Sequence, residues 1–366
     1  MNECLLTETT RALLKSIGKP AGKLTPFGGG SNHYVFSADT LDGERLIVKF
    51  PRVRETERKY QRGHRDTLFD GELSLEREAY LFGAVRAGGL PAPGVVGIYE
   101  TPAGPCIIVS RSPGLNLPDY MASVGHSVSA FLNVMTGLGR DFSRLHRLRY
   151  PSFGNLMAGG SIEPCGITNF ADRYLPINDR LISVCRDKGG LSDGEHTLVR
   201  NFFSDRFFAW RSRLAIDAAP ATLVITDMHG GNFFVENGRP SGYFDVESAQ
   251  AAPAEFELYS FRFFVFNFYG NAEFLRAEKA FFSAYYNGQQ DAPDPQTDRL
   301  IDFFSACRLL ELFQSYWGVH DGLRDEWGAR IKSILFDYME NDTVDYARLG
   351  ALWRARDGQP TVPRIP

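Results

Sequence analysis

The stretch of sequence that decides the fold covers residues 225–247 and reads ITDMHGGNFFVENGRPSGYFDVE. An acidic residue, Asp227, stands five positions before an amide, Asn232, and a second acidic residue, Asp245, follows an aromatic-rich hairpin sequence. This order is typical of sites that supply one base and two metal ligands for phosphoryl transfer. A purely structural interpretation is also open, in which Asp227 caps a turn, Asn232 lies in a glycine-rich loop and Asp245 closes a hairpin.

The residue types suit phosphoryl transfer for physical reasons. A transferring phosphoryl group needs in-line positioning and charge neutralisation more than covalent help from the protein. Because Mg2+ prefers oxygen ligands and keeps several waters, Asn232 and Asp245 can complete its coordination together with nucleotide phosphates. Asp227 would then orient an acceptor hydroxyl and take its proton.

A glycine-rich segment near the N-terminus gives a second signal. Residues 26–36 read PFGGGSNHYVF, and the strand sequence LIVKF, which carries Lys49, follows a turn signal at Asp42 and Gly43. Glycines let backbone N–H groups approach phosphate oxygens, and a lysine on the adjacent strand can hold the α- and β-phosphates. A flexible turn is the alternative for the glycines alone. The loop residues predicted to cover the nucleotide are Gly28, Gly29, Gly30, Ser31 and Asn32.

A lysine in an apolar strand needs a carboxylate partner, because an unpaired buried charge is costly. Residues 72–86, ELSLEREAYLFGAVR, place apolar side chains at helical spacing, which predicts a helix. Glu78 is favoured as the partner over Glu76 because it directly precedes the apolar run AYLF. A solvated acid remains the ordinary interpretation of either residue.

The next segment predicts two strands followed by a hinge. The sequences LPAPGVVGIYE and PCIIVSRSPG end in a break at Pro113 and Gly114. Backbone groups from Ser110 to Ser112 are placed to contact an adenine edge. We therefore expect a nucleotide-binding lobe over residues 1–113 and a helical lobe over residues 114–366, which carries the catalytic loop and the acceptor site.

With these motifs in order, the chain resembles the aminoglycoside phosphotransferase and choline kinase group of small-molecule kinases over about residues 24–260. The matching segments are GGGSNHYVF, IVKF, REAYLF, RAGGLPAPGV, IIVSRSPG, FSRLHRL, DMHGGN and FDVE. The resemblance implies an α+β, protein-kinase-like fold with a small antiparallel β-sheet lobe, one key helix and a larger, mostly helical lobe. It also implies a catalytic base at Asp227, Mg2+ ligands at Asn232 and Asp245, and ATP or GTP as phosphate donor.

One departure from the family pattern concerns the residues before the base. The family usually has His-Gly there, whereas this chain has Ile225 and Thr226. We expect an active enzyme, because the base, amide and metal carboxylate are kept; the alternative is a catalytically inactive pseudokinase that acts as a binding module. His229 is expected to make a loop hydrogen bond. Glu247 is a candidate for contact with substrate or a second metal, or for closing the loop.

Length and composition agree with this interpretation. The chain has 366 residues, 43% of them hydrophobic, which is enough for two lobes, and a net charge of −4 gives no global reason to expect nucleic acid as a partner. We expect no membrane span, because polar residues interrupt the aromatic segment 256–286, and no signal peptide. A cytoplasmic location is expected because the cysteines are scattered and show no disulfide or metal-ligand spacing. They are Cys4, Cys106, Cys165, Cys185 and Cys307.

The acceptor is expected to be a small molecule with a hydroxyl group, such as a sugar, an aminoglycoside or another natural product. Its specificity is expected to lie in residues 150–200 and 255–320, while the basic, polar residues 52–66 form either a solvated segment or a lid over an anionic ligand. An acidic wall would suit a cationic amino-sugar. The acidic candidates for that wall are Glu255, Glu257, Asp302 and Glu311.

Overall fold

The computed structural model describes residues 3–27, 33–52, 74–319 and 324–357. Three predicted segments therefore lie wholly or mostly outside the described residues. They are the nucleotide loop Gly28, Gly29, Gly30, Ser31 and Asn32, residues 53–66 of the basic segment, and the C-terminal residues 358–366.

The described residues of the N-terminal part form a five-stranded antiparallel sheet that has a helix on each side. Its strand order is β1-β2-β3-β5-β4. The predicted turn joins β2 to β3, where the Thr40 N–H donates to the Glu44 carbonyl at 2.9 Å and Gly43 adopts a φ of +90°, which favours glycine. The elements are α1 (Glu3–Ser16), β1 (Ala21–Pro26), β2 (His33–Thr40), β3 (Arg45–Pro51), α3 (Leu75–Ala87), β4 (Val95–Tyr99) and β5 (Cys106–Ser110).

The alternation of side chains along β3 decides where Lys49 points. Leu46, Val48 and Phe50 belong to a hydrophobic cluster that includes residues of α1. Ile47 instead packs against the larger core on the other face of the sheet. Because successive side chains of a strand alternate between its faces, Lys49 lies on the Ile47 side, toward α3.

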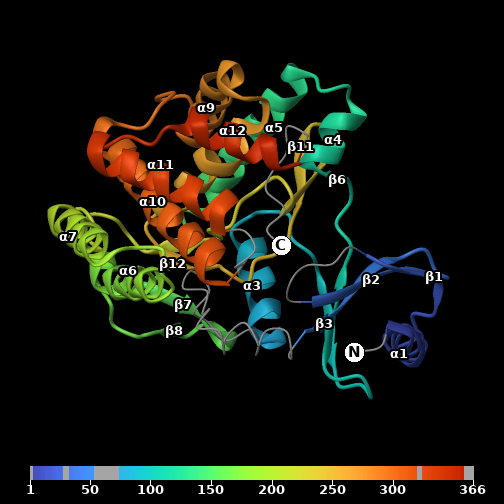
Figure 1. Cartoon of the computed structure of the whole chain (residues 1–366). Coiled ribbons are helices and arrows are strands. Elements are labelled where there is room, and N and C mark those ends of the chain that lie inside the picture. The colour runs from blue at the N-terminus through green and yellow to red at the C-terminus, as the bar shows by residue number, and fades with distance from the viewer. Residues whose placement is uncertain (1–2, 28–32, 53–73, 320–323, 358–366) are drawn as a thin grey trace.

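The helix α3 begins where the sequence provides a cap. The Ser74 side chain accepts a hydrogen bond from the Arg77 N–H at 3.0 Å. Leu81, Phe82 and Val85 are buried in the larger core, which continues into the C-terminal part. Figure 1 shows α3 between the sheet and the helices of the C-terminal part.

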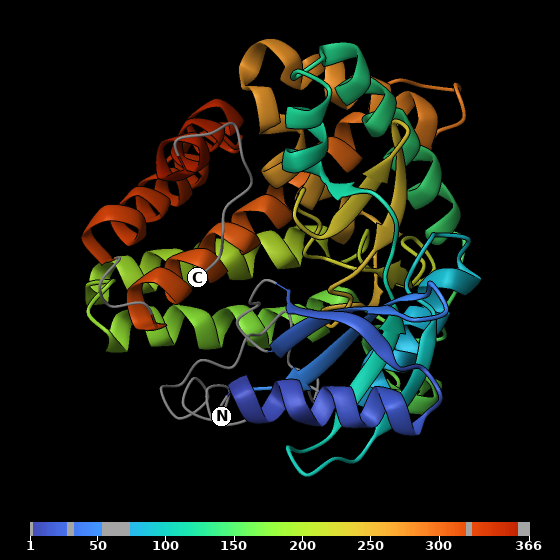
Figure 2. The same ribbon diagram turned by 90° about the vertical axis from the view of Figure 1, so that its right-hand side faces the viewer.

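The C-terminal part is mostly helical and joins the sheet region on the side of α3 (Figures 1 and 2). Ser192 forms a capping box with Glu195 at the start of α7. The aromatic segment 256–286 is helical, and it buries the phenylalanines Phe261, Phe263, Phe264, Phe266 and Phe268. The described helices of the C-terminal part are α4 (Leu117–Ser123), α5 (Val128–Leu145), η1 (Ala158–Gly160), α6 (Phe170–Asp187), α7 (Asp193–Trp210), α8 (Glu255–Ser260), η2 (Phe261–Val265), η3 (Phe266–Tyr269), α9 (Asn271–Tyr285), α10 (Pro295–Gln314), η4 (Ser315–Val319), η6 (Arg324–Gly328), α11 (Ala329–Asn341) and α12 (Tyr346–Asp357).

Two short sheets hold the loops of the decisive sequence stretch. One has the order β11-β10-β6 and the other β8-β7-β12-β9, so residues 225–232 connect one small sheet to the other, and residues 244–249 lead back. Among the described residues, no helix combines the length and the apolar character needed to cross a membrane. The strands are β6 (Leu115–Asn116), β7 (Gly154–Leu156), β8 (Ile162–Glu163), β9 (Thr222–Val224), β10 (Phe233–Glu236), β11 (Arg239–Tyr243) and β12 (Gln250–Ala252).

Candidate active site

The loop between β9 and β10 is held by short-range hydrogen bonds. The His229 N–H donates to the Asp227 carbonyl at 3.1 Å, and the Asn232 N–H donates to the His229 carbonyl at 2.9 Å. The Asn232 side-chain N–H2 also donates to the Asp227 carbonyl at 2.8 Å. This bond uses the amide nitrogen and leaves the amide oxygen of Asn232 as the group that can bind a cation.

The β10–β11 hairpin brings Asp245 beside Asn232. Phe233 is paired with Tyr243, and the Phe244 N–H donates to the Asn232 carbonyl at 3.2 Å. Asp245 follows directly, with a left-handed φ of +60°. The two oxygen ligands predicted from the sequence thus come from the paired ends of one hairpin.

Asp245 has an unusual ionisation. Its side chain is exposed, yet it is densely surrounded by protein and by other carboxylates. Burial of this kind, then the negative charges of Glu247, Asp227 and Glu78, raise its pKa to about 7, against the opposing effect of Lys49. A divalent cation would relieve this concentration of negative charge, so the donor set fits Mg2+.

Lys49 lies between two carboxylates. Its ammonium group contacts Glu78 Oε1 directly and lies 3.4 Å from Glu247 Oε1. Burial alone would lower the pKa of Lys49, but Glu78, Glu247 and Asp245 raise it above its usual value. The lysine therefore stays charged, as a group that binds phosphate oxygens must.

Glu247 also contacts His33, at 3.1 Å between Oε1 and Nδ1. Burial, and then the charge of Lys49, lower the pKa of His33 to about 4, so this imidazole is neutral near pH 7. His33, Glu78 and Glu247 place ligand atoms within 4.8 Å of one another, in a geometry that could hold a metal ion. Here the Lys49 ammonium group already contacts both carboxylates, and Asn232 with Asp245 remain the better cation ligands.

Arg77 links α3 to the loop that carries these acids. It is buried, and its guanidinium donates to the carbonyls of Leu156 at 2.6 Å, Glu247 at 2.6 Å and Ala249 at 3.0 Å. Arg77 was not among the site residues predicted from the sequence. The feature that could have indicated it is a charged residue on the same helix face as the apolar Leu81.

Glu257 on α8 holds the residues that replace the usual His-Gly. Its carboxyl group accepts the Ile225 N–H and, at 3.2 Å, the Thr226 N–H. Thr226 has a left-handed φ of +66°, which is unfavourable for a β-branched residue. The Tyr259 hydroxyl, which donates to the Thr226 carbonyl at 3.1 Å, helps to hold this conformation.

Asp227 is bound by Arg308 of α10. Arg308 Nη2 lies 3.1 Å from Asp227 Oδ1, and Nη1 contacts Glu311. Both Arg308 and Glu311 are buried. This contact fixes one carboxylate oxygen of Asp227 and leaves Oδ2 for a further partner.

The acidic residues expected to form an acceptor wall are used inside the protein. Glu257 binds the catalytic loop, Glu311 binds Arg308, Glu255 lies 3.3 Å from Arg213, and Asp302 accepts from Tyr346 at 2.6 Å. All four are buried, because helices α8 and α10 pack into the core. These carboxyl groups therefore serve the fold.

Hydrogen bonds within the protein already occupy part of the backbone that was expected to contact adenine. The N–H groups of Ser110 and Arg111 donate to the carbonyls of Gly94 and Arg45, at 2.7 and 2.8 Å. The Ser110 hydroxyl also accepts the Gly94 N–H at 2.7 Å. Within this segment, the backbone of Ser112 is the remaining candidate.

Comparison with known proteins identifies the family of the chain. A family model described as the phosphotransferase enzyme family matches residues 23–295. The chain belongs to the phosphotransferase enzyme family. No curated protein matches its sequence.

Solved structures of aminoglycoside phosphotransferases share the fold of this phosphotransferase. A complex of APH(4)-Ia with ADP and hygromycin B has a TM-score of 0.60 and 16% identity, covering 90% of this chain and 97% of the other. A complex of APH(2")-IIa with streptomycin and ATP has a TM-score of 0.60 and 14% identity, covering 93% and 98%. ADP-bound APH(2'')-Ib has a TM-score of 0.56 and 13% identity, covering 94% and 97%. The predicted protein-kinase-like α+β fold is thereby confirmed.

Proposed function

We propose that this phosphotransferase is a magnesium-dependent kinase that transfers the γ-phosphate of ATP or GTP to a hydroxyl group of a small molecule. The observation that carries the proposal is the grouping of these side chains around Asp245, which lies next to Asn232. Asp227, Glu78, Glu247 and Lys49 all lie near enough for their charges to affect the ionisation of Asp245. These are the groups that a phosphoryl-transfer site needs.

In the proposed mechanism, Lys49 binds the α- and β-phosphates while Glu78 and Glu247 keep its ammonium group in place. Asn232 and Asp245 would hold Mg2+, and the ion would supply positive charge that neutralises the phosphates. Asp227 accepts the hydrogen of the acceptor hydroxyl at Oδ2, because Arg308 occupies Oδ1. The prediction from the sequence that Gly28 to Ser31 cover the phosphates concerns residues outside those that the structure describes.

The family and the ligands of structural neighbours support a class of acceptor. Among the neighbours are complexes of other phosphotransferases with hygromycin B, streptomycin and gentamicin. We propose a sugar, an aminoglycoside or another natural-product hydroxyl as acceptor. The five free cysteines accord with the reducing cytosol, where we place the protein.

The test combines nucleotide binding with product release. ATP and then GTP are titrated calorimetrically with and without Mg2+ into the wild type and Asp245→Asn, and panels of hydroxyl acceptors are screened for ADP or GDP release. We expect metal-dependent binding that Asp245→Asn loses. We also expect Asp227→Asn to bind nucleotide normally but to turn over about 100 to 10,000 times more slowly.

The alternative, suggested by Ile225 and Thr226, is a nucleotide-binding protein without transfer activity. It predicts acceptor-independent background release at the same rate in the wild type and Asp227→Asn. Absence of binding for both nucleotides would contradict the kinase and the nucleotide-binding alternative together.

A further inference from the structure

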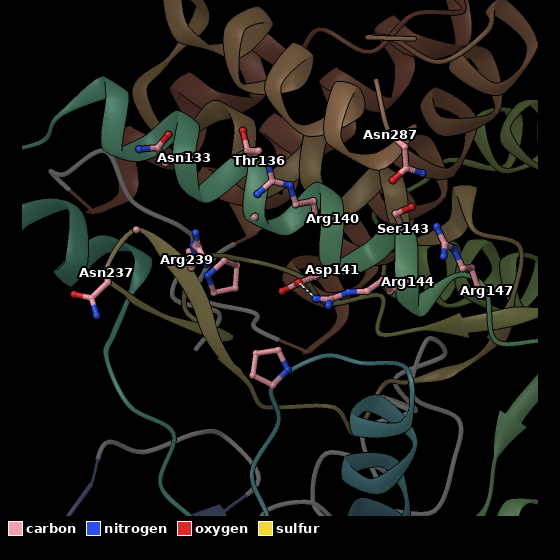
Figure 3. A pocket seen from close by; sticks show the side chains of 14 residues that line it. Asn133, Thr136, Arg140, Asp141, Ser143, Arg144, Arg147, Asn237, Arg239 and Asn287 are labelled. Atoms are coloured by element: carbon pink, nitrogen blue, oxygen red, sulfur yellow. Dashed lines mark hydrogen bonds and ion pairs between the residues drawn. The ribbon is translucent and has the colours of Figure 1, made fainter. Parts of the chain in front are cut away.

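A groove between α5 and the β10–β11 hairpin is separate from the candidate active site. It encloses about 840 Å³, within the range of about 300–1,000 Å³ that is usual for small-molecule sites. Its lining includes none of the residues assigned above to the base, the metal or the phosphate contacts. Figure 3 shows its side chains along α5 and on the hairpin.

The lining of this groove is strongly basic. It contains four arginines, Arg140, Arg144, Arg147 and Arg239, against a single acid, Asp141, which gives a formal charge of +3. The whole chain has a net charge of −4, so positive charge is concentrated here against the overall balance. A local field of this sign attracts anions.

Most of these arginines have no acidic partner. Asp141 is buried, accepts from the Tyr243 hydroxyl at 2.7 Å and contacts Arg144. The side chains of Arg140, Arg147 and Arg239 make no hydrogen bond or ion pair within the part of the chain that the structure describes, and Arg140 acts on Asp141 only through its field. All three side chains are exposed.

Rigid elements fix the arrangement of the arginines. Arg140 and Arg144 lie about one helical turn apart on α5, and Arg147 lies in the turn that directly follows this helix (Figure 3). Arg239 begins β11, across the groove. The two elements approach closely at Gly137, where a Cβ atom would lie 2.5 Å from Pro240 Cδ. The arginines therefore face a space of set width.

We propose that this groove binds a small polyanion that carries at least two phosphate groups. Guanidinium groups match phosphate oxygens through paired hydrogen bonds, and arginines on two elements suit phosphates that lie apart from each other. The asparagine and hydroxyl side chains of the lining, among them Asn237, Thr136 and Ser143, supply further hydrogen-bonding groups. The volume suits a molecule of nucleotide size, and the acidic net charge gives nucleic acid no general attraction.

The first test reads the site directly, because the catalytic site is itself expected to bind phosphates. Inorganic tripolyphosphate is the probe, and arginine modification by phenylglyoxal is followed peptide by peptide with mass spectrometry. We expect tripolyphosphate to protect Arg140, Arg147 and Arg239, and to leave the exposed Arg11 of α1 as reactive as before. Equal reactivity of the groove arginines with and without the probe would overturn the proposal.

The second test measures affinity by calorimetry. In the double variant Arg140→Gln, Arg239→Gln, the affinity of this site for tripolyphosphate should fall by about tenfold or more, since each change removes a charge-assisted contact. The control variant Arg11→Gln, Lys15→Gln removes the same charge from the exposed side of α1 and should bind as the wild type does. Equal weakening in the groove variant and the control variant would show that the loss of affinity reflects net charge alone. Loss of all tripolyphosphate binding in Lys49→Ala would assign the binding to the catalytic site. Either result contradicts the proposal.

Discussion

At the scale of single residues, Asp245 carries the ionisation that matters most for the proposed chemistry. Its pKa of about 7 lies above the usual value for aspartate, because surrounding protein and three acids disfavour its charge. Below pH 7 the group is mostly protonated and neutral, and above pH 7 it is mostly ionised. A proton and a metal ion therefore compete for the same carboxylate.

We accordingly predict that the apparent affinity for Mg2+ in the presence of nucleotide is about tenfold weaker at pH 6 than at pH 8. Calorimetry at the two pH values, or electron paramagnetic resonance with Mn2+ as substitute, checks this. Asp245→Asn serves as the control, and it should bind metal weakly at both pH values. An affinity of the wild type that does not change between pH 6 and pH 8 would contradict the assignment of Asp245 as ligand.

Single residues also show what the sequence could predict about the site. The contact of Lys49 with Glu78 was predictable, because Lys49 is the one charge in the apolar run LIVKF, whose alternation and turn are local signals. The proximity of Asn232 and Asp245 was predictable because both lie within one short motif with Asp227; the roles of these residues remain proposals. Arg308 was not, since its contact with Asp227 joins residues 81 positions apart and depends on how α10 packs.

At the scale of secondary-structure elements, α8 supports the loop after β9 through Glu257 and Tyr259. Glu257 accepts two backbone N–H groups, and burial raises its pKa to about 8 despite those hydrogen bonds. At pH 7 the group is therefore mostly protonated. Its contribution is the shape and hydrogen bonding of a neutral group rather than negative charge.

The hydrogen bonds of Glu257 predict different effects for two substitutions at this position. Glu257→Ala leaves the Ile225 and Thr226 N–H groups buried without acceptors, which should lower the free energy of unfolding by about 2–5 kcal/mol and reduce turnover. Glu257→Gln keeps one acceptor oxygen but turns its side-chain N–H2 toward the other backbone N–H, because Oε2 accepts from Ile225 and Oε1 from Thr226. It should therefore lose about half as much as alanine. Urea unfolding followed by circular dichroism measures both variants. A glutamine variant as stable as the wild type would contradict acceptance of both N–H groups by Glu257.

Elements themselves were largely predictable where their signals are local. The hairpin after Thr40, the helix from Leu75 and the cap at Ser192 each depend on residues a few positions apart. The role of Glu257 was missed because nothing near it in the sequence indicates which loop it faces. An acid within the apolar run AEFELYSF was the available sign of a buried polar contact.

At the scale of the whole molecule, Arg77 connects the helix of the N-terminal part to the small sheet of the C-terminal part. Its three carbonyl acceptors lie in β7 and in the loop from Glu247 to Ala249. The predicted lobe boundary after residue 113 remains a proposal. One hydrophobic cluster includes residues of α3 and β5 together with residues of the C-terminal helices, so the two proposed lobes share a core.

We predict that Arg77→Met lowers the free energy of unfolding by about 3 kcal/mol or more, because three buried carbonyls lose a charged donor. Arg86→Met, on the exposed side of the same helix, is the matched control and should change it by less than about 0.5 kcal/mol. Guanidinium unfolding of both variants provides the comparison. Equal effects in the two variants would show that Arg77 does not join the parts.

The shared core has a consequence for control of the protein. The C-terminal end of α3 rests on α5 so closely that a Cβ atom at Gly88 would lie 2.6 Å from Leu145 Cδ1. A swing of α3 that withdrew Glu78 from Lys49 would open this packing and break the contacts of Arg77. We expect the enzyme to be competent as soon as it folds, so that cells would set its output through synthesis, degradation and substrate supply.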